Sequence, residues 1–388
     1  MLPGDCGINA SNRRLSGEMH NRTGVIGKLR SGLTRFNSGP ASRQFCRHPV
    51  NPAPLPNSLP RLTQGRMALY AAGLGAAYGL FARFVFGLQM AKGLFEVMSI
   101  TYIFVVPVVL GFITVWYGPK PKRLFWGACI VLPWVAALAC LAGALIFAWE
   151  GIICIVLLLP VILVLSSVGG LIGGICLKVF LRSRERNFCV AIVAMLPFVL
   201  APLEKLHSAD SEIRTVETQI KIHAAAPIVW NQIRSVPLIT EKEQSFSFSH
   251  LIGFPRPLEA RLVGSGIGAV RYATFEHGVL FVETIQEWNP PYRLSFSIKA
   301  DTKNIPPKTF DEHVTVGGRY FDVLKGTYWI EDLGHGDVML HLSSDQRLST
   351  RFNFYSHLWT EYLMADLQNY ILRIIKKRCE SNGAVATA

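Results

Sequence analysis

Five apolar runs limit what this chain can fold into more than any other feature. They cover about residues 67–90, 95–117, 124–149, 152–181 and 188–203. A helix needs about 20 consecutive apolar residues to cross the ~30 Å hydrocarbon core of a bilayer, and the middle three runs exceed that length. The first run carries Arg83 and Gln89, and the last contains Pro197 and Pro202. Residues 67–206 are therefore predicted to form a membrane domain with about five transmembrane helices.

The distribution of charge supports the same interpretation. The net charge of +13 divides into +8 in residues 1–66, +6 in residues 67–206 and −1 in residues 207–388. A basic excess confined to the first two parts indicates a membrane surface as the partner and argues against a nucleic-acid-binding domain in the last part. The 17% content of charged residues is also below the quarter that is usual in soluble domains.

The loops between the apolar runs predict an orientation. Basic residues occupy positions 120–123 and 182–186, whereas Glu150 is the one charge between the third and fourth runs. Basic loops face the cytoplasm, so five crossings place the chain from residue 207 onward on the other side. The prediction is an integral protein of the plasma (inner) membrane whose C-terminal domain lies on the outer or periplasmic side. Lys92 argues weakly against this orientation, because it is a basic residue in the connection between the first and second runs, which would lie on the outer side.

The two ends of the chain are predicted to be disordered tails. Residues 1–66 are rich in Arg, Ser, Asn, Gly and Pro, and the Pro-rich stretch at 49–56 fits neither helix nor strand. This segment is interpreted as a basic cytoplasmic tail, as an organelle transit peptide or as residues upstream of a start at Met67. Residues 381–388 form the second tail.

Two features inside the apolar runs have both a structural and a functional interpretation. Arg83 is a charge at membrane depth, which suggests function, but it lies near a helix end and can extend to the surface. The glycines at 169–170 and 173–174 favour close helix packing, either between two copies of the chain or within one bundle. Packing within one bundle is the favoured interpretation.

The pattern changes to that of an α+β domain over residues 207–380. Apolar and polar residues alternate as in strands at about 212–223, 270–275, 279–288, 292–298, 319–330 and 337–344. Ala226-Pro227 begins a helix, and apolar residues recur at helical spacing over 353–378. The glycines at 264, 266 and 268 predict a tight turn rather than a phosphate-binding loop.

The order of these elements, with three segments of sequence, resembles the START/Bet v 1-like helix-grip superfamily of polyketide cyclases, dehydrases and lipid-transport proteins. The segments are Ile220–Trp230, Glu283–Pro291 and Leu294–Phe296, and the long closing helix follows them. The resemblance covers about residues 212–380, and the membrane part resembles no family. It implies a curved antiparallel sheet that grips the closing helix around an apolar cavity. A curved sheet and one helix leave space that side chains alone do not fill.

The alternation of the strands and the helical spacing predict which side chains line this cavity. They face inward from three strands and from the closing helix, with Glu283 as the buried polar group: Glu283, Leu294, Phe296, Ile298, Leu340, Leu342, Trp359 and Leu363. A buried carboxylate needs a partner or has a raised pKa, and Arg271 and Arg256 are the candidate partners. The alternative is that these side chains pack against one another as a filled core.

No catalytic residue, metal site or cofactor is assigned from the sequence. Candidate acid–base groups are Glu276 with His277, Asp311 with Glu312 and His313, Tyr320 with Asp322, and His250 with Arg256. Catalysis requires two such groups within hydrogen-bond reach, which a sequence does not show. The cysteines and the C-terminal histidines lack the spacing of metal ligands.

The leading hypothesis is a membrane-anchored binding module that holds a hydrophobic or lipid-like ligand in the helix-grip cavity. The alternatives are a cyclase or dehydratase acting on an apolar substrate in that cavity, and a sensor or assembly protein whose helix-grip domain contacts a protein partner that the sequence does not identify. Fold alone does not choose among them. A non-enzymatic role is favoured.

Overall fold

The computed structural model describes residues 61–88, 94–119, 126–180, 186–204, 206, 211–301 and 315–386. All of these residues belong to one compact unit, Ser58–Ala388. Residues 61–204 are called the helical part below, and residues 211–386 the sheet part. Most of the predicted N-terminal tail, the basic residues at 120–123, 182 and 184, and the group Asp311–His313 lie outside the described residues.

The helical part contains five apolar helices, as the five apolar runs predict. They are α1 (Arg61–Phe86), α2 (Val106–Tyr117), α3 (Trp126–Ile146), α4 (Ile152–Phe180) and α5 (Arg186–Glu204), and a short π-helical stretch, Thr101–Val105, leads into α2. Four are long and apolar enough to cross a membrane, whereas the continuous helix Thr101–Tyr117 is shorter. Nearly every residue of α2 is buried. A helix that is apolar and buried on all sides is enclosed by other helices, so α2 lies at the centre of this part.

Polar and aromatic contacts gather the helix ends at one end of the bundle. The Arg83 Nε atom lies 2.5 Å from the Glu150 carboxylate, so the end of α1 meets the turn before α4. The Glu204 carboxylate accepts hydrogen bonds from the backbone N–H groups of Ile100 and Thr101 at 2.7 and 2.9 Å. Phe86, Val97 and Ala201 form a buried cluster between these ends. Arg83 therefore reaches the turn at this end of the bundle, where it is partly buried and paired with Glu150.

The glycine stripe of α4 packs inside this bundle. A Cβ atom at Gly169 would overlap the backbone carbonyl of Val108 in α2, and one at Gly170 would overlap the carbonyl of Cys129 in α3. Backbone atoms cannot move aside as a flexible side chain does, so only glycine fits at both positions. These contacts agree with packing within one bundle, the favoured interpretation of the two.

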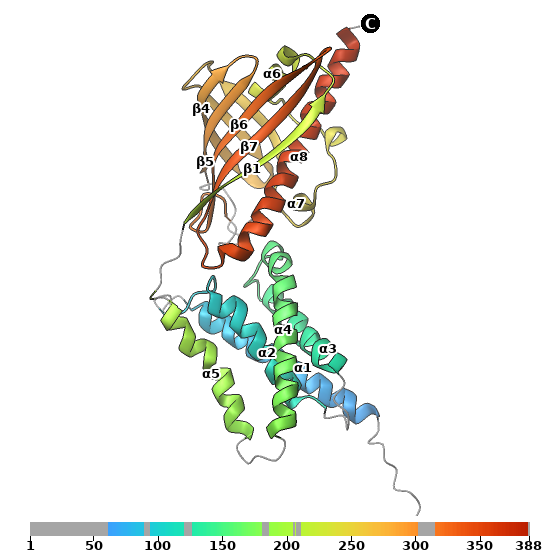
Figure 1. The fold of residues 1–388 in the computed structure, drawn as a ribbon, viewed down its shortest axis with the longest axis vertical. Coiled ribbons are helices and arrows are strands. Elements are labelled where there is room, and N and C mark those ends of the chain that lie inside the picture. The colour runs from blue at the N-terminus through green and yellow to red at the C-terminus, as the bar shows by residue number, and fades with distance from the viewer. Residues whose placement is uncertain are drawn as a thin grey trace, which may run out of the picture. The chain divides into compact units, whose positions relative to one another are not determined.

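The sheet part is a seven-stranded antiparallel sheet with three helices. Its strands lie in the order β1-β7-β6-β5-β4-β3-β2. Their bounds are β1 Glu212–Ile222, β2 Pro257–Val263, β3 Val270–Phe275, β4 Leu280–Asn289, β5 Arg293–Asp301, β6 Phe321–Gly334 and β7 Asp337–Leu348. The helices α6 (Ala226–Arg234) and α7 (Phe248–Leu251) separate β1 from β2, and α8 (Asn353–Ala386) closes the chain. This order agrees with the helix-grip arrangement (Figure 1).

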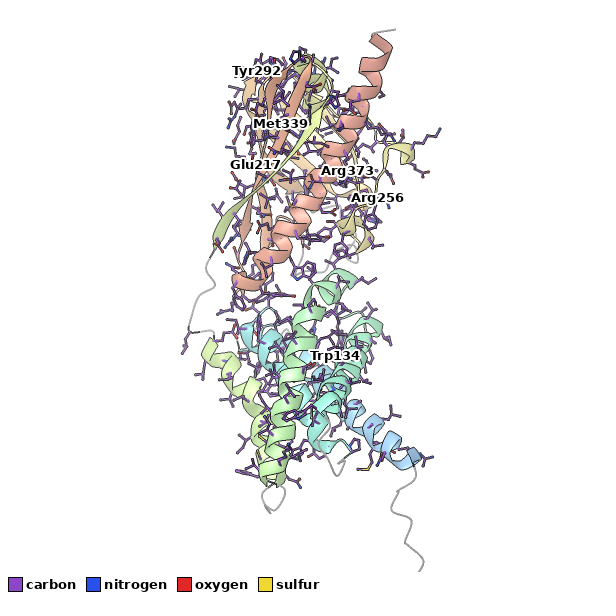
Figure 2. All side chains as sticks on the ribbon, turned by 45° about the vertical axis from the view of Figure 1, so that its right-hand side comes forward. Trp134, Glu217, Arg256, Tyr292, Met339 and Arg373 are labelled. Carbon is purple, nitrogen blue, oxygen red and sulfur yellow. The ribbon has the colours of Figure 1, made fainter. Side chains whose placement is uncertain are left out.

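The two faces of the sheet differ as strand alternation requires. On β7, Val338, Leu340 and Leu342 are buried on the face toward α8. Glu217 on β1 and Met339 on β7, both labelled in Figure 2, belong to the opposite face. The sequence analysis missed one strand, β2. It begins at Pro257 and lies at the edge of the sheet, where a proline at the first residue is tolerated.

Side chains also join the helical part to the sheet part. The Tyr320 hydroxyl donates to the Glu96 carboxylate at 2.7 Å, and the Arg351 guanidinium donates to the Glu204 carbonyl at 2.9 Å. Ile153 of α4 is buried in one cluster with Ile252 and Leu363. The last of these contacts connects the N-terminal half of α8 to the start of α4, and the second connects Arg351, just before α8, to the end of α5.

Candidate functional site

An apolar cavity of about 300 Å³ lies between the sheet and the N-terminal half of α8. That volume is at the lower end of the range for small-molecule sites. Its wall is formed by strands β2 to β7, by the inner face of α8 from Tyr355 to Ile371, and by the start of α4. Residues on the inner face of α8 such as Met364 and Leu367 are only partly buried, because they border empty space instead of packed side chains.

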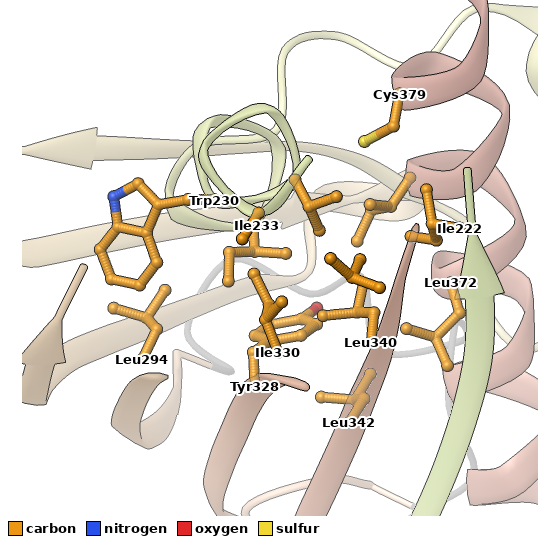
Figure 3. Packing of buried hydrophobic residues seen from close by; sticks show 14 of the residues in the cluster. Ile222, Trp230, Ile233, Leu294, Tyr328, Ile330, Leu340, Leu342, Leu372 and Cys379 are labelled. Atoms are coloured by element: carbon orange, nitrogen blue, oxygen red, sulfur yellow. The ribbon is translucent and has the colours of Figure 1, made fainter. Parts of the chain in front are cut away.

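Six of the eight predicted cavity residues lie around this space, and two do not. Glu283, Phe296, Ile298, Leu342, Trp359 and Leu363 line it. Leu294 and Leu340 face the same side of the sheet, but both are fully buried in a cluster with Trp230 and Ile330 (Figure 3). The prediction that these two leucines line the cavity is not met.

The reason is the position of each residue along its strand. Trp230 and Ile233 of α6 fill the space at one end of the sheet, where they pack with Leu372 and Cys379 from the second half of α8. Leu294 lies two residues before Phe296 on β5, and Leu340 lies two residues before Leu342 on β7. Both leucines therefore lie at this filled end. The predictions of a filled core and of a cavity therefore each describe one end of the same sheet part.

A buried ion pair forms the most polar part of the cavity wall. Arg271 on β3 and Glu283 on β4 are directly opposite each other in the sheet, and the Arg271 Nε atom donates to the Glu283 carboxylate. A second guanidinium nitrogen of Arg271 donates to the Ile233 carbonyl at 2.6 Å. The guanidinium carbon also lies 4.2 Å from the centre of the Phe296 ring, within range of a cation–π contact. Each charged group thus has its partners inside the protein.

This pair settles which arginine accompanies Glu283. The sequence left Arg271 and Arg256 open, and Arg256 instead donates to the Gln244 side chain at 2.8 Å. Burial raises the pKa of Glu283, and the Arg271 guanidinium opposes that rise. Burial likewise raises the pKa of the Tyr328 hydroxyl beside the pair to about 12, so this hydroxyl keeps its proton at neutral pH.

A second polar group in the cavity wall was not predicted. Gln368 on α8 is buried, and its amide nitrogen donates to the Val216 carbonyl at 3.0 Å and to the Ser344 hydroxyl at 2.6 Å. Its amide oxygen accepts from the Thr218 hydroxyl at 2.9 Å. The signal in the sequence was a glutamine within the apolar stripe of α8, next to Leu367. Its hydrogen bonds fix α8 against β1 and β7.

Of the other candidate acid–base groups in the described part of the chain, Tyr320 lines the cavity, whereas Glu276, His277 and Asp322 do not. The Glu276 carboxylate accepts from the backbone N–H of Arg256 at 3.1 Å, and the His277 backbone lies in a left-handed turn. Tyr320 binds Glu96, and Asp322 lies 4.0 Å from Arg347. Among the described residues, no group of three His, Cys, Asp or Glu side chains is placed to hold a metal ion.

His250 of α7 is one of several side chains in the described part of the chain whose buried polar atoms lack a hydrogen-bond partner. Its ring lies edge-on to the Tyr370 ring with centroids 4.5 Å apart, and neither of its ring nitrogens has a hydrogen-bond partner. Burial lowers the pKa of His250 to about 4, helped by Arg256 and opposed by Asp366 and Glu276. The imidazole is therefore neutral in the folded protein at pH 7.

This environment predicts a loss of stability in mild acid. In the unfolded chain His250 binds a proton below about pH 6.5, whereas burial keeps it neutral in the folded protein down to a pKa of about 4. The contribution of His250 to the free energy of unfolding is therefore present above about pH 6.5 and is lost as the pH falls toward 4. We expect the part due to His250 to be about 1 kcal/mol between about pH 7.5 and pH 5, after allowance for its partial exposure. Thermal unfolding of the full chain measures it: His250→Phe is expected to flatten the pH dependence, whereas His357→Phe is the control. Equal slopes in wild type and His250→Phe would contradict the assignment.

This chain was compared with family models, curated proteins and solved structures. No family model matches this chain, and no curated protein matches it. Among solved structures, a truncated norcoclaurine synthase from Thalictrum flavum is similar over 44% of this chain and 97% of its own, with 12% identity and a TM-score of 0.27.

Two further structures are similar to the same degree. A START superfamily protein from Mycobacterium smegmatis is 9% identical over 43% of this chain and 98% of its own, with a TM-score of 0.29. A conserved protein of unknown function from Enterococcus faecalis is 10% identical over 45% of this chain and 76% of its own, with a TM-score of 0.26. Likeness at this level carries no argument about function.

Proposed function

We propose that the protein binds a hydrophobic or lipid-like ligand in the cavity of its sheet part and that its apolar helices hold this cavity at a membrane. The cavity itself is the observation that carries the proposal. Its lining is mostly aliphatic and aromatic, and such a space favours a ligand that is itself apolar. The transfer of such a ligand from water into the cavity is favourable in free energy even when the ligand forms no hydrogen bond with the protein.

The enzymatic alternative has one observation in its favour. Arg271, Glu283 and Tyr328 come together in the cavity wall, where burial raises the pKa of Glu283. However, the Arg271 guanidinium is bonded to Glu283 and to the Ile233 carbonyl. A general acid or base must reach the substrate, and these groups reach each other instead. Binding is therefore the better-supported proposal, and an open cavity also favours it over a purely structural role.

Lipid extracted from the purified full chain tests the proposal. Mass spectrometry of protein purified from membranes is expected to find one class of apolar molecule bound in near-stoichiometric amount. The variant Leu367→Trp places an indole in the cavity and is expected to carry at least about tenfold less of it. Equal amounts in both proteins would assign the lipid to the surface of the apolar helices and contradict the proposal.

The proposed orientation makes a separate prediction. If basic loops face the cytoplasm, reporter fusions at residues 150 and 385 should both read as external, and a fusion at 183 as internal. Residues 83, 100, 150 and 204 lie at one end of the bundle. This agrees with the expectation that residue 150 and the chain after residue 204 lie on the same side of the membrane. A cytoplasmic signal at 385 would contradict the orientation and leave ligand binding untouched.

A further inference from the structure

Part of the cavity wall comes from the helical part. Cys154, Leu157 and Leu158 of α4 line the cavity together with Met98. All four are apolar side chains. Across the cavity from the sheet, the neighbouring wall is the start of α8, with Tyr355 and Trp359. The end of the cavity that lies away from the filled core is thus closed by an apolar surface of α4.

The length of α4 explains how one helix can serve both a membrane and the cavity. Its apolar stretch Ile152–Val179 has 28 residues, which is about 42 Å at 1.5 Å per residue. A bilayer core needs only ~30 Å, so about eight residues are in excess. The contacts with the sheet part lie in the first two turns, up to Pro160, and these turns include every α4 residue that lines the cavity.

These two turns are held in place by specific bonds. The Tyr355 hydroxyl of α8 donates to the Leu157 carbonyl, and the Trp359 Nε1 atom donates to the same hydroxyl at 2.9 Å. Buried contacts of Ile153 with Ile252 and Leu363 complete the attachment.

The outer surface around this attachment is apolar as well. Ile152 is 59% exposed at the start of α4, and Phe354 and Leu358, one turn apart on α8, are 61% and 57% exposed. Phe354 also contacts the Phe104 ring of the helical part, with centroids 5.3 Å apart. Exposed aromatic and aliphatic side chains beside apolar helices suit the boundary between lipid and water.

We infer that the ligand passes directly between the lipid phase and the cavity along the first two turns of α4. This inference rests on the proposed function and extends it: the ligand is a component of the membrane itself, and the helical part loads the cavity as well as anchoring it. A molecule that follows this route stays against apolar side chains, so its chain is never exposed to water. The residues that control the route are Leu157 and Leu158, which border the cavity from α4.

The test uses the full chain in phosphatidylcholine nanodiscs. A stearic acid analogue with a photoactivatable diazirine is supplied from phosphatidylcholine vesicles, and peptides labelled after successive irradiation times are identified by mass spectrometry. Labelling of the second half of α4 reports arrival of the probe in the bilayer, and labelling of β5 and of the inner face of α8 reports entry into the cavity. In wild type, the cavity peptides are expected to become labelled soon after the bilayer peptides.

Variants of the two leucines then separate the route from the binding site. Leu157→Trp/Leu158→Trp is expected to slow labelling of the cavity at least about tenfold without slowing that of the bilayer peptides. Ile152→Trp, on the same two turns but exposed and outside the lining, is expected to keep the wild-type rate. Leu157→Ala/Leu158→Ala widens the passage and is expected to speed labelling, which decides the matter if the tryptophan variant does not fold.

Each outcome bears on one of the two proposals. Wild-type rates in both double variants would overturn the route and leave ligand binding intact. Absence of label in the cavity peptides of wild type, at any time, would overturn ligand binding and the route with it. Slower entry in the tryptophan variant, or faster entry in the alanine variant, supports the route.

Discussion

Glu283→Leu is expected to lower the free energy of unfolding by about 3–5 kcal/mol, because it leaves the Arg271 guanidinium charged, buried and without its carboxylate. Both side chains are almost wholly buried, with 4% and 7% of their surfaces exposed. Among the described contacts of Arg271, no other acidic side chain replaces the lost partner. Chemical denaturation of the full chain, followed by tryptophan fluorescence, measures the effect.

An exposed pair in the same sheet is a matched control. Arg293 and Glu287 are 2.9 Å apart, and about half of each side chain is exposed. Glu287→Leu removes the same chemical group but is expected to cost less than about 1 kcal/mol, since water solvates the arginine that remains. Similar costs for the two variants would mean that Arg271 reaches solvent and that the cavity wall is not as described.

The double variant Arg271→Met/Glu283→Leu distinguishes the cost of an unpaired charge from the value of the pair. Apolar replacement of a buried pair is often neutral or stabilising, so we expect the double variant to be within about 1 kcal/mol of wild type. A double variant as unstable as Glu283→Leu alone would show that the Arg271 hydrogen bond to the Ile233 carbonyl, which ties β3 to α6, is the more important contact.

The second large effect is a contrast between two leucines on α8. Leu372 is fully buried among close-packed side chains, and Leu372→Trp is expected to destabilise the protein by about 3 kcal/mol or to prevent folding, as overpacking of a filled core does. Leu367 borders the cavity. Leu367→Trp has space for the indole and is expected to change stability by less than about 1 kcal/mol.

Denaturation midpoints of the two tryptophan variants, in detergent and without added lipid, provide the comparison. The same substitution on the same helix controls for helix propensity and for the chemistry of the new side chain. Equal destabilisation at both positions would mean that the end of the sheet part near α4 is filled, and the binding proposal would lose its main support.

Phe296→Arg is a weaker test of the cavity than these variants. Phe296 is nearly fully buried, its ring lies against Gly326, and the Arg271 guanidinium lies over its face. A second guanidinium at this position would be placed beside Arg271. It would disrupt the sheet part whether or not a ligand binds, because like charges repel strongly in a buried site.

The secondary structure could be predicted well because it depends on periodicity. The alternation from Leu294 to Ile298 and the helical spacing from Trp359 to Ile374 each identified an element and its buried face. The strand β2 was missed because it is an edge strand of seven residues with only one fully buried residue, which leaves little apolar alternation in its sequence. The length of the helix ending at Tyr117 was overestimated because the apolar run begins before the helix does.

The site could be predicted only in part. Glu283 was identified because a carboxylate on an apolar strand face requires a partner, but its partner was not, since Arg271 and Arg256 are equivalent in sequence. The sequence contained only a weak indication that Gln368 lies in the cavity wall. It contained no indication for Cys154, Leu157 and Leu158. The last three belong to an apolar run whose composition fits a membrane helix along its whole length.

The amino-acid sequence by itself determined the class of each part: apolar runs of sufficient length, an alternating sheet and an amphipathic closing helix. These are local properties, because the period of a pattern is decided by backbone geometry within one element. The tertiary structure alone decided that Leu294 and Leu340 are core while Phe296 and Leu342 border empty space. It also decided that Arg271 meets Glu283, and that α4 completes the cavity wall. Each depends on which distant elements meet in space, and the period within one element carries no record of that.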